Sequence, residues 1–294
     1  PEVESVDARQ RKLPPPLLYD LTELQRHANR LYGYSAKKTL DLAQSLYETK
    51  KLLSYPRTAS RHLSSAVAED LGAIVRAIQE PYREQLAPGT GERPLGTRFV
   101  DDTRVSDPHA IVPTPKSAES VSLSADEANL YDLVCRRLLS AWHADHLYST
   151  TTVITAIHNE AIVDRYRSSG TTIDRDAWKV LDVKRRKPAS GQADSSERQL
   201  PPGLVAGLPV DVTQAKSVSH KTRPPLHFTD STLLTGMESA GRSLDDKQLS
   251  DAMRGTGLGT PATRAAIIET LIARGYATRK EKTLAATDKG IALI

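Results

Sequence analysis

Cysteine is nearly absent from this sequence, since Cys135 is the only one among 294 residues. A single thiol excludes an internal disulfide and a cysteine-based zinc site, and it fits a reducing compartment, so we expect a cytoplasmic protein. No stretch approaches the 18 consecutive apolar residues of a membrane-spanning helix. The opening residues, Pro1-Glu2-Val3-Glu4, lack the basic and then apolar segments of a secretory signal. Because no Met stands at position 1, we expect a piece of a longer chain.

Composition places the chain among ordinary globular proteins. Hydrophobic residues make up 38% and charged residues 26%, a balance that excludes a wholly disordered chain. The length allows two or three domains. The formal net charge is +4, which is compatible with a polyanionic partner but does not by itself indicate one.

The first half of the chain is predicted to be helical after an extended start. Three prolines at positions 14–16 cannot lie within a helix. A helix follows with Thr22 as its cap and ends at Gly33, and a second helix begins at Ser35. The tight glycine connection could form a helix-turn-helix unit, but a plain helical hairpin is favoured. Further along, we predict a short strand at Leu52-Leu53 and helices at about 65–80 and 125–144.

The second half changes character near Leu147. Residues 149–156 are rich in β-branched side chains and predict a strand, as do 171–183 and 204–215, with a polar and basic loop at 184–202 between them. After Phe228 a helix capped by Thr229 or Asp230 is expected, then a helix opened by the loop 257–263. A hairpin pairing 276–278 with 283–285 would complete an order similar to a winged helix.

The predicted fold class is therefore a multidomain α+β protein. An extended segment at 1–16 joins a β-rich domain at 147–226. A helical, winged-helix-like domain occupies 17–146, and a helical segment, also winged-helix-like, occupies 227–294.

The first candidate site is Ser54-Tyr55-Pro56-Arg57-Thr58. A phenol is a weak nucleophile at neutral pH and needs help with its proton and with charge that gathers on the group it attacks. An arginine two residues later lies on the same side of an extended segment, and its planar guanidinium suits phosphate. Taken alone, such a tripeptide is more often a half-buried tyrosine at a strand end.

Two further segments carry polar groups that suit phosphate. His109, in the proline-bounded segment 107–114, can donate a hydrogen bond to phosphate. The loop Gly257–Thr263 opens a helix, whose free N–H groups attract anions, and Thr263, Arg264 and Arg274 add a hydroxyl and positive charge. Each signal alone is more often structural.

In this order and context, the segments resemble the bacterial type IA DNA topoisomerases, most closely the topoisomerase III branch. The resemblance covers about Lys12 to Ser60, Pro108 to Thr114 and Phe228 to about Gly290. It includes the proline-rich entry at 14–17, the run Leu-Tyr-Glu-Thr-Lys at 46–50, and the loop from Gly257. One departure is Thr260, which stands where another branch has an arginine, so no charged phosphate contact is expected there.

The resemblance implies roles for individual residues. Tyr55 matches the nucleophile that forms a 5′-phosphotyrosine and leaves a 3′-hydroxyl. Arg57 matches the arginine that steadies the scissile phosphate, and His109 matches a histidine near the cleavage site. Thr263 and Arg274 match positions that hold the single strand, and Thr58 and Arg264 beside these motifs are also predicted to contact DNA.

The resemblance also implies parts that this chain does not contain. In the family, a Toprim domain supplies the acidic cluster that binds Mg²⁺, and nothing before Lys12 could hold it. Asp174-Arg175-Asp176 lacks a following acid and is interpreted as a surface turn, so no metal site is predicted here. The expected partners are single-stranded DNA and the Toprim domain of the same polypeptide, and no membrane is expected. The whole protein would be a monomeric isomerase that needs no ATP. This fragment alone is expected to be inactive. The β-rich domain would act as a hinge.

Other classes of DNA protein fit less well. A tyrosine recombinase needs an H-x-x-R motif, which His62-Leu63-Ser64-Ser65 lacks, and a rolling-circle nickase needs a His-x-His pair, which does not occur. His143 and His146 are interpreted as helix-surface histidines. The run Lys184–Lys187 could contact DNA, but a solvated loop is favoured. The alternative that stays open is a non-catalytic nucleic-acid-binding module built from winged helices, in which Tyr55 would be structural.

Overall fold

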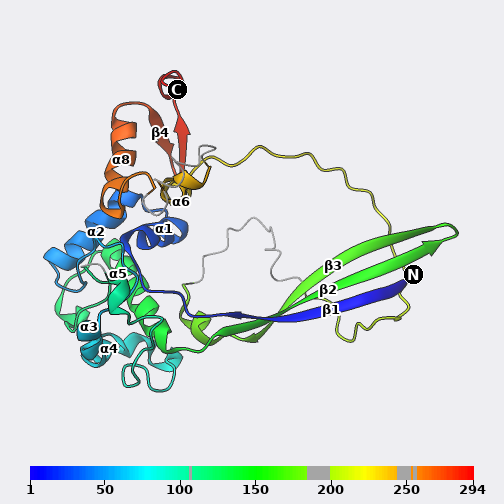
Figure 1. Ribbon diagram of the computed structural model, residues 1–294, viewed down its shortest axis with the longest axis horizontal. Coiled ribbons are helices and arrows are strands. Elements are labelled where there is room, and N and C mark those ends of the chain that lie inside the picture. Colours follow the sequence, from blue (N-terminus) through cyan, green and yellow to red (C-terminus); the bar gives the residue numbers. More distant parts are fainter. Residues whose placement is uncertain (106–107, 184–198, 244–252, 254–256) are drawn as a thin grey trace. The chain divides into compact units, whose positions relative to one another are not determined.

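The computed structural model describes residues 1–105, 108–183, 199–243, 253 and 257–294, and the chain divides into two compact units (Figure 1). The first unit comprises Pro1–Pro15 and Ala144–Pro224, and the second comprises Pro16–His143 and Pro225–Ile294. The stretches expected as separate parts, 17–146 and 227–294, therefore lie almost wholly in one unit. Asp107, the run Lys184–Lys187 and most of the predicted loop 184–202 lie outside the described residues.

The first unit is built on a three-stranded antiparallel sheet of long strands in the order β1-β2-β3 (Figure 1). The strands are β1 (Glu2–Leu13), β2 (His146–Asn159) and β3 (Ile162–Arg175). Val6 pairs with Val153, which pairs in turn with Ser168. The β-branched run 150–155 thus forms the middle of the central strand, where such side chains pack well.

One strand prediction in this unit was wrong, and another was right only in part. Residues 204–215 form no strand apart from a single bridge between Glu2 and Pro209. Pro209 has no N–H to donate, and Gly207 adopts a left-handed φ of 81°, so neither residue suits a regular ladder. This segment nevertheless contacts β1, because Val3 N donates to Leu208 O at 2.9 Å and Gly207 N donates to Val3 O at 2.8 Å.

The predicted strand at 171–183 ends at Arg175, because Ala177 adopts a φ of 48° and opens a short 3-10 helix, Ala177–Leu181. Trp178 is buried there and donates its indole N–H to Leu13 O at 2.8 Å. Asp174 and Arg175, expected within a surface turn, are instead the last two residues of β3.

The second unit is mainly helical. Its helices are α1 (Leu21–Tyr32), α2 (Ala36–Glu48), α3 (Ser65–Glu69), α4 (Leu71–Ile78), α5 (Ala125–Leu139), α6 (Asp230–Glu238), α8 (Pro261–Ala273) and α9 (Asp288–Ile291), and its hairpin pairs β4 (Ala277–Lys280) with β5 (Thr283–Ala286). Short 3-10 turns lie at 80–85, 102–104, 118–120, 140–142 and 240–243. None of the helices described is long and apolar enough to cross a membrane.

Helix boundaries differ from the prediction at two places. Asp20, rather than Thr22, caps α1, and its carboxylate accepts from Glu23 N at 2.6 Å. The helix predicted at 65–80 is broken at Asp70, which ends α3 and begins α4. Aspartate competes with the helical backbone for hydrogen bonds and is favoured at helix ends, which accounts for the break.

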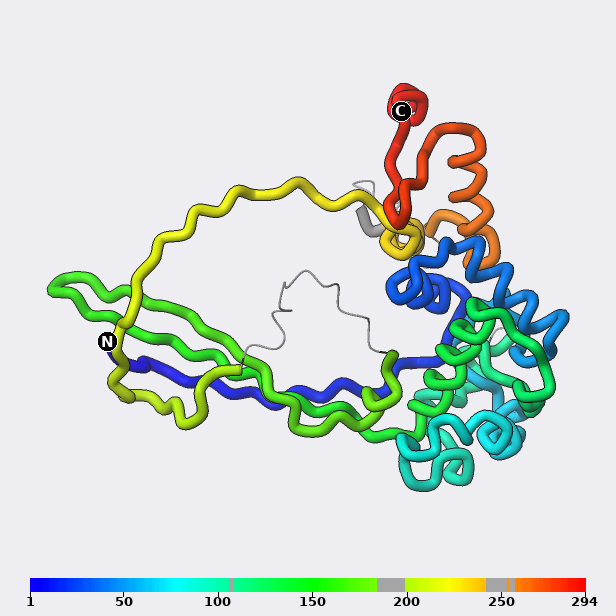
Figure 2. The backbone as a smooth tube through the Cα atoms, turned by 180° about the vertical axis from the view of Figure 1, so that it is seen from behind, coloured from blue at the N-terminus to red at the C-terminus, as the bar shows by residue number. Residues whose placement is uncertain are grey.

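The two chain segments of the second unit share a small apolar core, and Figure 2 shows them against each other. Ala36, at the start of α2, is 1% exposed and packs in one cluster with residues of α6, α8 and β5. The buried members from the later segment are Leu234, Met237, Ala265, Ile268 and Leu284.

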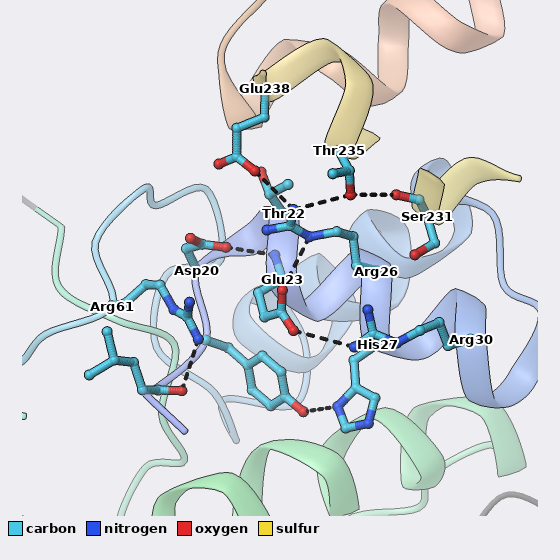
Figure 3. A network of polar contacts seen from close by, with 12 residues as sticks. Asp20, Thr22, Glu23, Arg26, His27, Arg30, Arg61, Ser231, Thr235 and Glu238 are labelled. Atoms are coloured by element: carbon cyan, nitrogen blue, oxygen red, sulfur yellow. Dashed lines mark hydrogen bonds and ion pairs between the residues drawn. The ribbon is translucent and has the colours of Figure 1, made fainter. Parts of the chain in front are cut away.

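Polar contacts cross the same boundary (Figure 3). On α1, Arg26 donates to Glu238 Oε2 at 2.9 Å and to Thr235 Oγ1 at 3.3 Å. Ser231 N donates to Asn29 Oδ1 at 3.2 Å. Asp230 is 1% exposed, and its carboxylate accepts from Ala36 N at 3.1 Å and from Arg279 Nη2 at 3.0 Å. The buried carboxylate of Asp230 is therefore paired with an arginine, as a charge removed from water requires.

His27 on α1 is held neutral by its surroundings. The buried Tyr19 hydroxyl contacts its Nδ1, and Arg137 Nη2 approaches the same atom at 3.4 Å. The guanidinium of Arg137 can only donate, so Nδ1 accepts and the proton of the neutral ring lies on Nε2. Burial first, and then the positive charges of Arg137 and Arg30, lower the pKa of His27 from 6.5 to about 4.

The stability of the second unit should therefore depend on pH through His27. Above pH 6.5 neither the folded nor the unfolded chain protonates this ring. Between pH 6.5 and about 4 this ring is protonated in the unfolded chain but not in the folded chain, so the free energy of unfolding falls as the pH falls. The expected loss by pH 4 is about 3 kcal/mol.

Urea denaturation at neutral and acidic pH would measure this effect, with His27→Gln as the comparison, because glutamine can accept from Tyr19 but does not titrate. We expect the variant to lose less stability on acidification. An identical pH dependence in both proteins would contradict the assignment.

Candidate active site around Tyr55

The segment that carries Tyr55 begins with a sharp turn at the end of α2. Lys51 adopts a left-handed φ of 58° and turns the chain back, so that Leu52 N donates to Leu46 O at 2.8 Å. Leu52 and Leu53 are 0% and 1% exposed and anchor the segment in the core. Their burial fixes the path of the residues that follow.

Backbone pairing then fixes this segment against the segment that contains His109. Ser54 N donates to Val112 O at 2.9 Å, and Thr114 N donates to Leu52 O at 2.9 Å. Leu53 bridges Pro113 in the antiparallel sense. The strand predicted at Leu52-Leu53 is thus reduced to a single bridge pair.

Tyr55 lies just after this pairing and is accessible. Its side chain is 40% exposed. Its ring meets the ring of Tyr47 edge to face, with centroids 5.4 Å apart and planes at 80°. Such aromatic pairs are favourable, so Tyr47 limits the positions open to the nucleophile candidate. The phenol is not locked inside an apolar core.

Arg57 is half-buried and is held by a residue that the sequence analysis missed. Its Nη2 donates to Gln44 Oε1 at 3.1 Å, while Gln44 Nε2 donates to Glu48 Oε1 at 3.1 Å. The second bond fixes which end of the amide faces Arg57. A guanidinium has five N–H donors, so this contact orients Arg57 and leaves donors for a ligand. The spacing of Gln44 and Glu48, four residues apart on one helix, was the available signal.

His109 is tied to the Tyr55 segment through one carbonyl group. Its Nδ1 contacts Ala110 O at 2.7 Å, and Ser54 Oγ donates to the same oxygen at 3.3 Å. A carbonyl only accepts, so Nδ1 carries a proton and Nε2 is the atom left for other chemistry. Tyr55 follows Ser54 directly, so the structure brings the first two sequence motifs together.

Thr58, predicted to contact DNA, is 2% exposed in this structure. Its Oγ1 donates to Pro108 O at 2.6 Å and accepts from Ser60 N at 2.9 Å. The side chain is therefore committed to holding the loop after Arg57 against the segment before His109.

The glycine loop at 257–263 leads into α8 as predicted, but its candidate residues differ in accessibility. Thr263 is exposed, and its hydroxyl accepts from Thr260 N at 2.9 Å in a capping arrangement. Arg264 is 3% exposed and donates to Thr22 Oγ1 at 3.2 Å. Arg274 is exposed at the far end of α8. At 1.5 Å per residue, about 16 Å of helix separates it from Thr263, so the two cannot hold one phosphate.

An open pocket of about 480 Å³ links the glycine loop to the Tyr55 segment. Ala59 lines it from the Tyr55 side, and Gly259 and Thr260 line it from the other. Asp20 also lines it, and burial first, with a contribution from Glu238, raises the pKa of this carboxyl group. The glycine loop and Ala59, the residue that follows the Ser54–Thr58 motif, therefore border a common space.

No metal site is apparent within the described ranges, because no group of three or more His, Cys, Asp or Glu side chains there could hold an ion.

Comparisons with known proteins agree on one family. The DNA topoisomerase family model matches residues 1–294. DNA topoisomerase 3 of Bacillus anthracis is 37% identical over 297 residues, covering 99% of this chain and 40% of that protein. DNA topoisomerase 3 of Vibrio cholerae is 34% identical, covering 97% of this chain and 43% of that protein.

A solved structure shares the fold. The full-length topoisomerase I of Thermotoga maritima aligns with a TM-score of 0.65 at 23% identity, over 98% of this chain and 43% of that protein. This chain spans about two fifths of the length of the relatives it matches. Together with the match to the family model over its whole length, these similarities show that the chain belongs to the DNA topoisomerase family.

Proposed function

We propose that this chain is the strand-cleaving and strand-binding part of a type IA DNA topoisomerase, of the topoisomerase III-like branch. The observation that carries the proposal is the exposed phenol of Tyr55 beside Arg57, in a segment joined to His109 through the Ala110 carbonyl. The relatives named DNA topoisomerase 3 support the same activity for the longer protein.

The proposed reaction exchanges one phosphodiester bond for another. The Tyr55 oxygen attacks a backbone phosphorus, the bond from phosphorus to the 3′-oxygen breaks, and a 5′-phosphotyrosine and a 3′-hydroxyl result. The phenol gives up one proton and the leaving oxygen gains one, so the step is balanced. Because the bond energy is retained, the 3′-hydroxyl can reverse the attack and rejoin the strand without ATP.

Arg57 and His109 are proposed to act on the phosphate. The guanidinium of Arg57, oriented by Gln44, would neutralise charge on the non-bridging oxygens. His109 holds Ala110 O with Nδ1, so Nε2 would donate to a phosphate oxygen when the ring is protonated. Mg²⁺, held by a Toprim domain of the longer polypeptide, would supply further charge neutralisation when bound.

Strand binding is proposed for the exposed residues of α8. Thr263 and Arg274 would contact phosphates at two separate points along a single strand, while Arg264 would act indirectly by holding the glycine loop against Thr22. We propose that α8 and the β4–β5 hairpin form a winged-helix-like arrangement that binds the strand. The sheet of the first unit is proposed to act as a hinge. The working form is proposed to be a cytoplasmic monomer.

The nucleophile assignment is tested by Tyr55→Phe in this chain joined to a Toprim domain and supplied with Mg²⁺. The variant lacks the attacking oxygen, so covalent capture of a single-stranded oligonucleotide should fall below detection. Binding should change little, because the ring and its contact with Tyr47 remain. Capture at the wild-type level would favour the non-catalytic binding module instead.

The role of Gln44 is tested by Gln44→Leu in the same assembly. Loss of the hydrogen bond that orients Arg57 should slow covalent capture by about tenfold. Affinity for the strand should stay nearly unchanged, and Lys37→Leu, an exposed change in the first turn of the same helix, should leave both properties intact. A lowered melting temperature together with a parallel loss of affinity and capture would show that Gln44 only maintains the fold.

The two arginines of α8 should respond differently to substitution by alanine. Arg274→Ala should weaken single-strand binding and reduce the slope of log affinity against log salt by about 0.7, with no loss of stability. Arg264→Ala should instead destabilise the unit by about 2 kcal/mol, because it leaves buried acceptors unpaired. Fluorescence anisotropy and thermal melting would separate the effects, and a flat salt dependence in all proteins would argue against DNA binding.

A further inference from the structure

The turn that leads to Tyr55 contains a residue in a costly conformation. Lys51 adopts a φ of 58°, in the left-handed region that side chains with a Cβ rarely occupy. Glycine or asparagine usually occupies such a left-handed position. Two other non-glycine residues with positive φ, Glu160 and Glu281, lie in hairpin turns, where the chain must reverse within two residues.

The backbone contacts of this turn need no particular side chain. The Lys51 carbonyl accepts from Thr114 Oγ1 at 2.7 Å, and the next amide, Leu52 N, donates to Leu46 O at 2.8 Å. Glycine would keep both bonds and remove the strain. A lysine at this position is therefore accounted for by its side chain rather than by the turn.

The ammonium group of Lys51 differs from those of its lysine neighbours. Lys50 Nζ donates to Ser122 O at 2.7 Å, and Lys116 Nζ donates to Lys50 O at 2.9 Å, so both are engaged with carbonyl groups. Lys51 is exposed, and within the described part of the chain its ammonium has an aromatic face rather than an oxygen as its partner. It keeps its charge available to an outside anion.

The position of this charge relates it to the nucleophile candidate. Lys51 Nζ lies 5.7 Å from the centroid of the Tyr47 ring, and that ring meets the Tyr55 ring with centroids 5.4 Å apart. The ammonium and the phenol thus contact the same aromatic ring. At 5.7 Å from the centroid of the half-buried Tyr47 ring, the ammonium is close to the outer limit of a cation–π contact, so the ring holds it weakly and the full charge of a phosphate would attract it more strongly.

We propose that Lys51 binds a backbone phosphate of the single DNA strand next to the phosphate that Tyr55 attacks. The proposal rests on the proposed cleavage at Tyr55, and Tyr47, which contacts both side chains, links the two positions. Lysine suits this task because its ammonium is a compact point charge on a flexible stem that can follow a mobile strand.

The test separates charge from backbone strain with three variants of the 294-residue chain. Lys51→Met removes the charge and keeps the strain, Lys51→Gly removes both, and Lys51→Arg keeps both. Lys37→Met is the matched control, because that exposed lysine of α2 is paired with Asp41. The measurements are anisotropy of a labelled single-stranded oligothymidylate across a range of salt concentrations, and thermal melting.

We expect both Lys51→Met and Lys51→Gly to bind about fivefold more weakly than the wild type at low salt. The slope of log affinity against log salt concentration should become shallower by about 0.7 in both variants. Lys51→Arg and Lys37→Met should bind like the wild type. Lys51→Gly should also melt about 2 °C higher, since it relieves the left-handed strain. Binding would then fall while stability rises, which a purely structural role for Lys51 cannot produce.

Wild-type binding by Lys51→Met would overturn the proposal, and so would a loss confined to variants with lowered melting temperatures. Arg57→Ala distinguishes this failure from failure of the proposed function. If Arg57→Ala weakens binding and Lys51→Met does not, only the role of Lys51 is lost. If neither change affects binding, the strand does not bind at Tyr55, and both proposals fail together.

Discussion

The candidate site depends on a short antiparallel pairing between residues 52–54 and 112–114. Main-chain bonds from Ser54 to Val112 and from Thr114 to Leu52 hold it, and the buried side chains of Leu52 and Leu53 anchor it. The shared acceptor at Ala110 O extends the pairing toward His109. Because these bonds use the backbone, the relative position of the Tyr55 and His109 segments tolerates many changes of side chain.

A second layer of contacts sets the orientation of individual groups. The side chain of Gln44 orients the guanidinium of Arg57, and the ring of Tyr47 restricts the positions of the Tyr55 ring. The hydroxyl of Thr58 holds the loop after Arg57 in place through its hydrogen bond to the Pro108 carbonyl. Such supporting residues decide whether a reactive group lies in its working geometry. The polar side chains of Ser54, Thr58 and His109 are bonded to carbonyl groups of the chain itself, which leaves Tyr55 and Arg57 as the groups most open to a ligand.

Sequence reasoning found the elements with strong local signals. The helices that follow Ser35 and Thr260, the glycine turn at Gly33 and the β-branched strand at 150–155 all carry capping or propensity patterns that tertiary structure did not override. The failures lie where local signals conflict. Residues 204–215 are rich in valine, but Pro209 and Gly207 prevent a ladder, and Asp70 interrupts an otherwise apolar helical pattern. At the site, Tyr55, Arg57 and His109 were nameable from motifs, whereas the burial of Thr58 and Arg264 and the contact of Gln44 depend on chain segments distant in sequence.

The division of the second unit into two chain segments has a consequence for biosynthesis. Among the described residues, the buried apolar side chains that cluster with Ala36 come from α6, α8 and β5, and the Ala36 amide donates to the carboxylate of Asp230 in α6. While the ribosome is still translating the β-rich region, the start of α2 has none of these partners. Folding of this unit must therefore finish after translation of its last segment, through contacts of high sequence separation that form slowly.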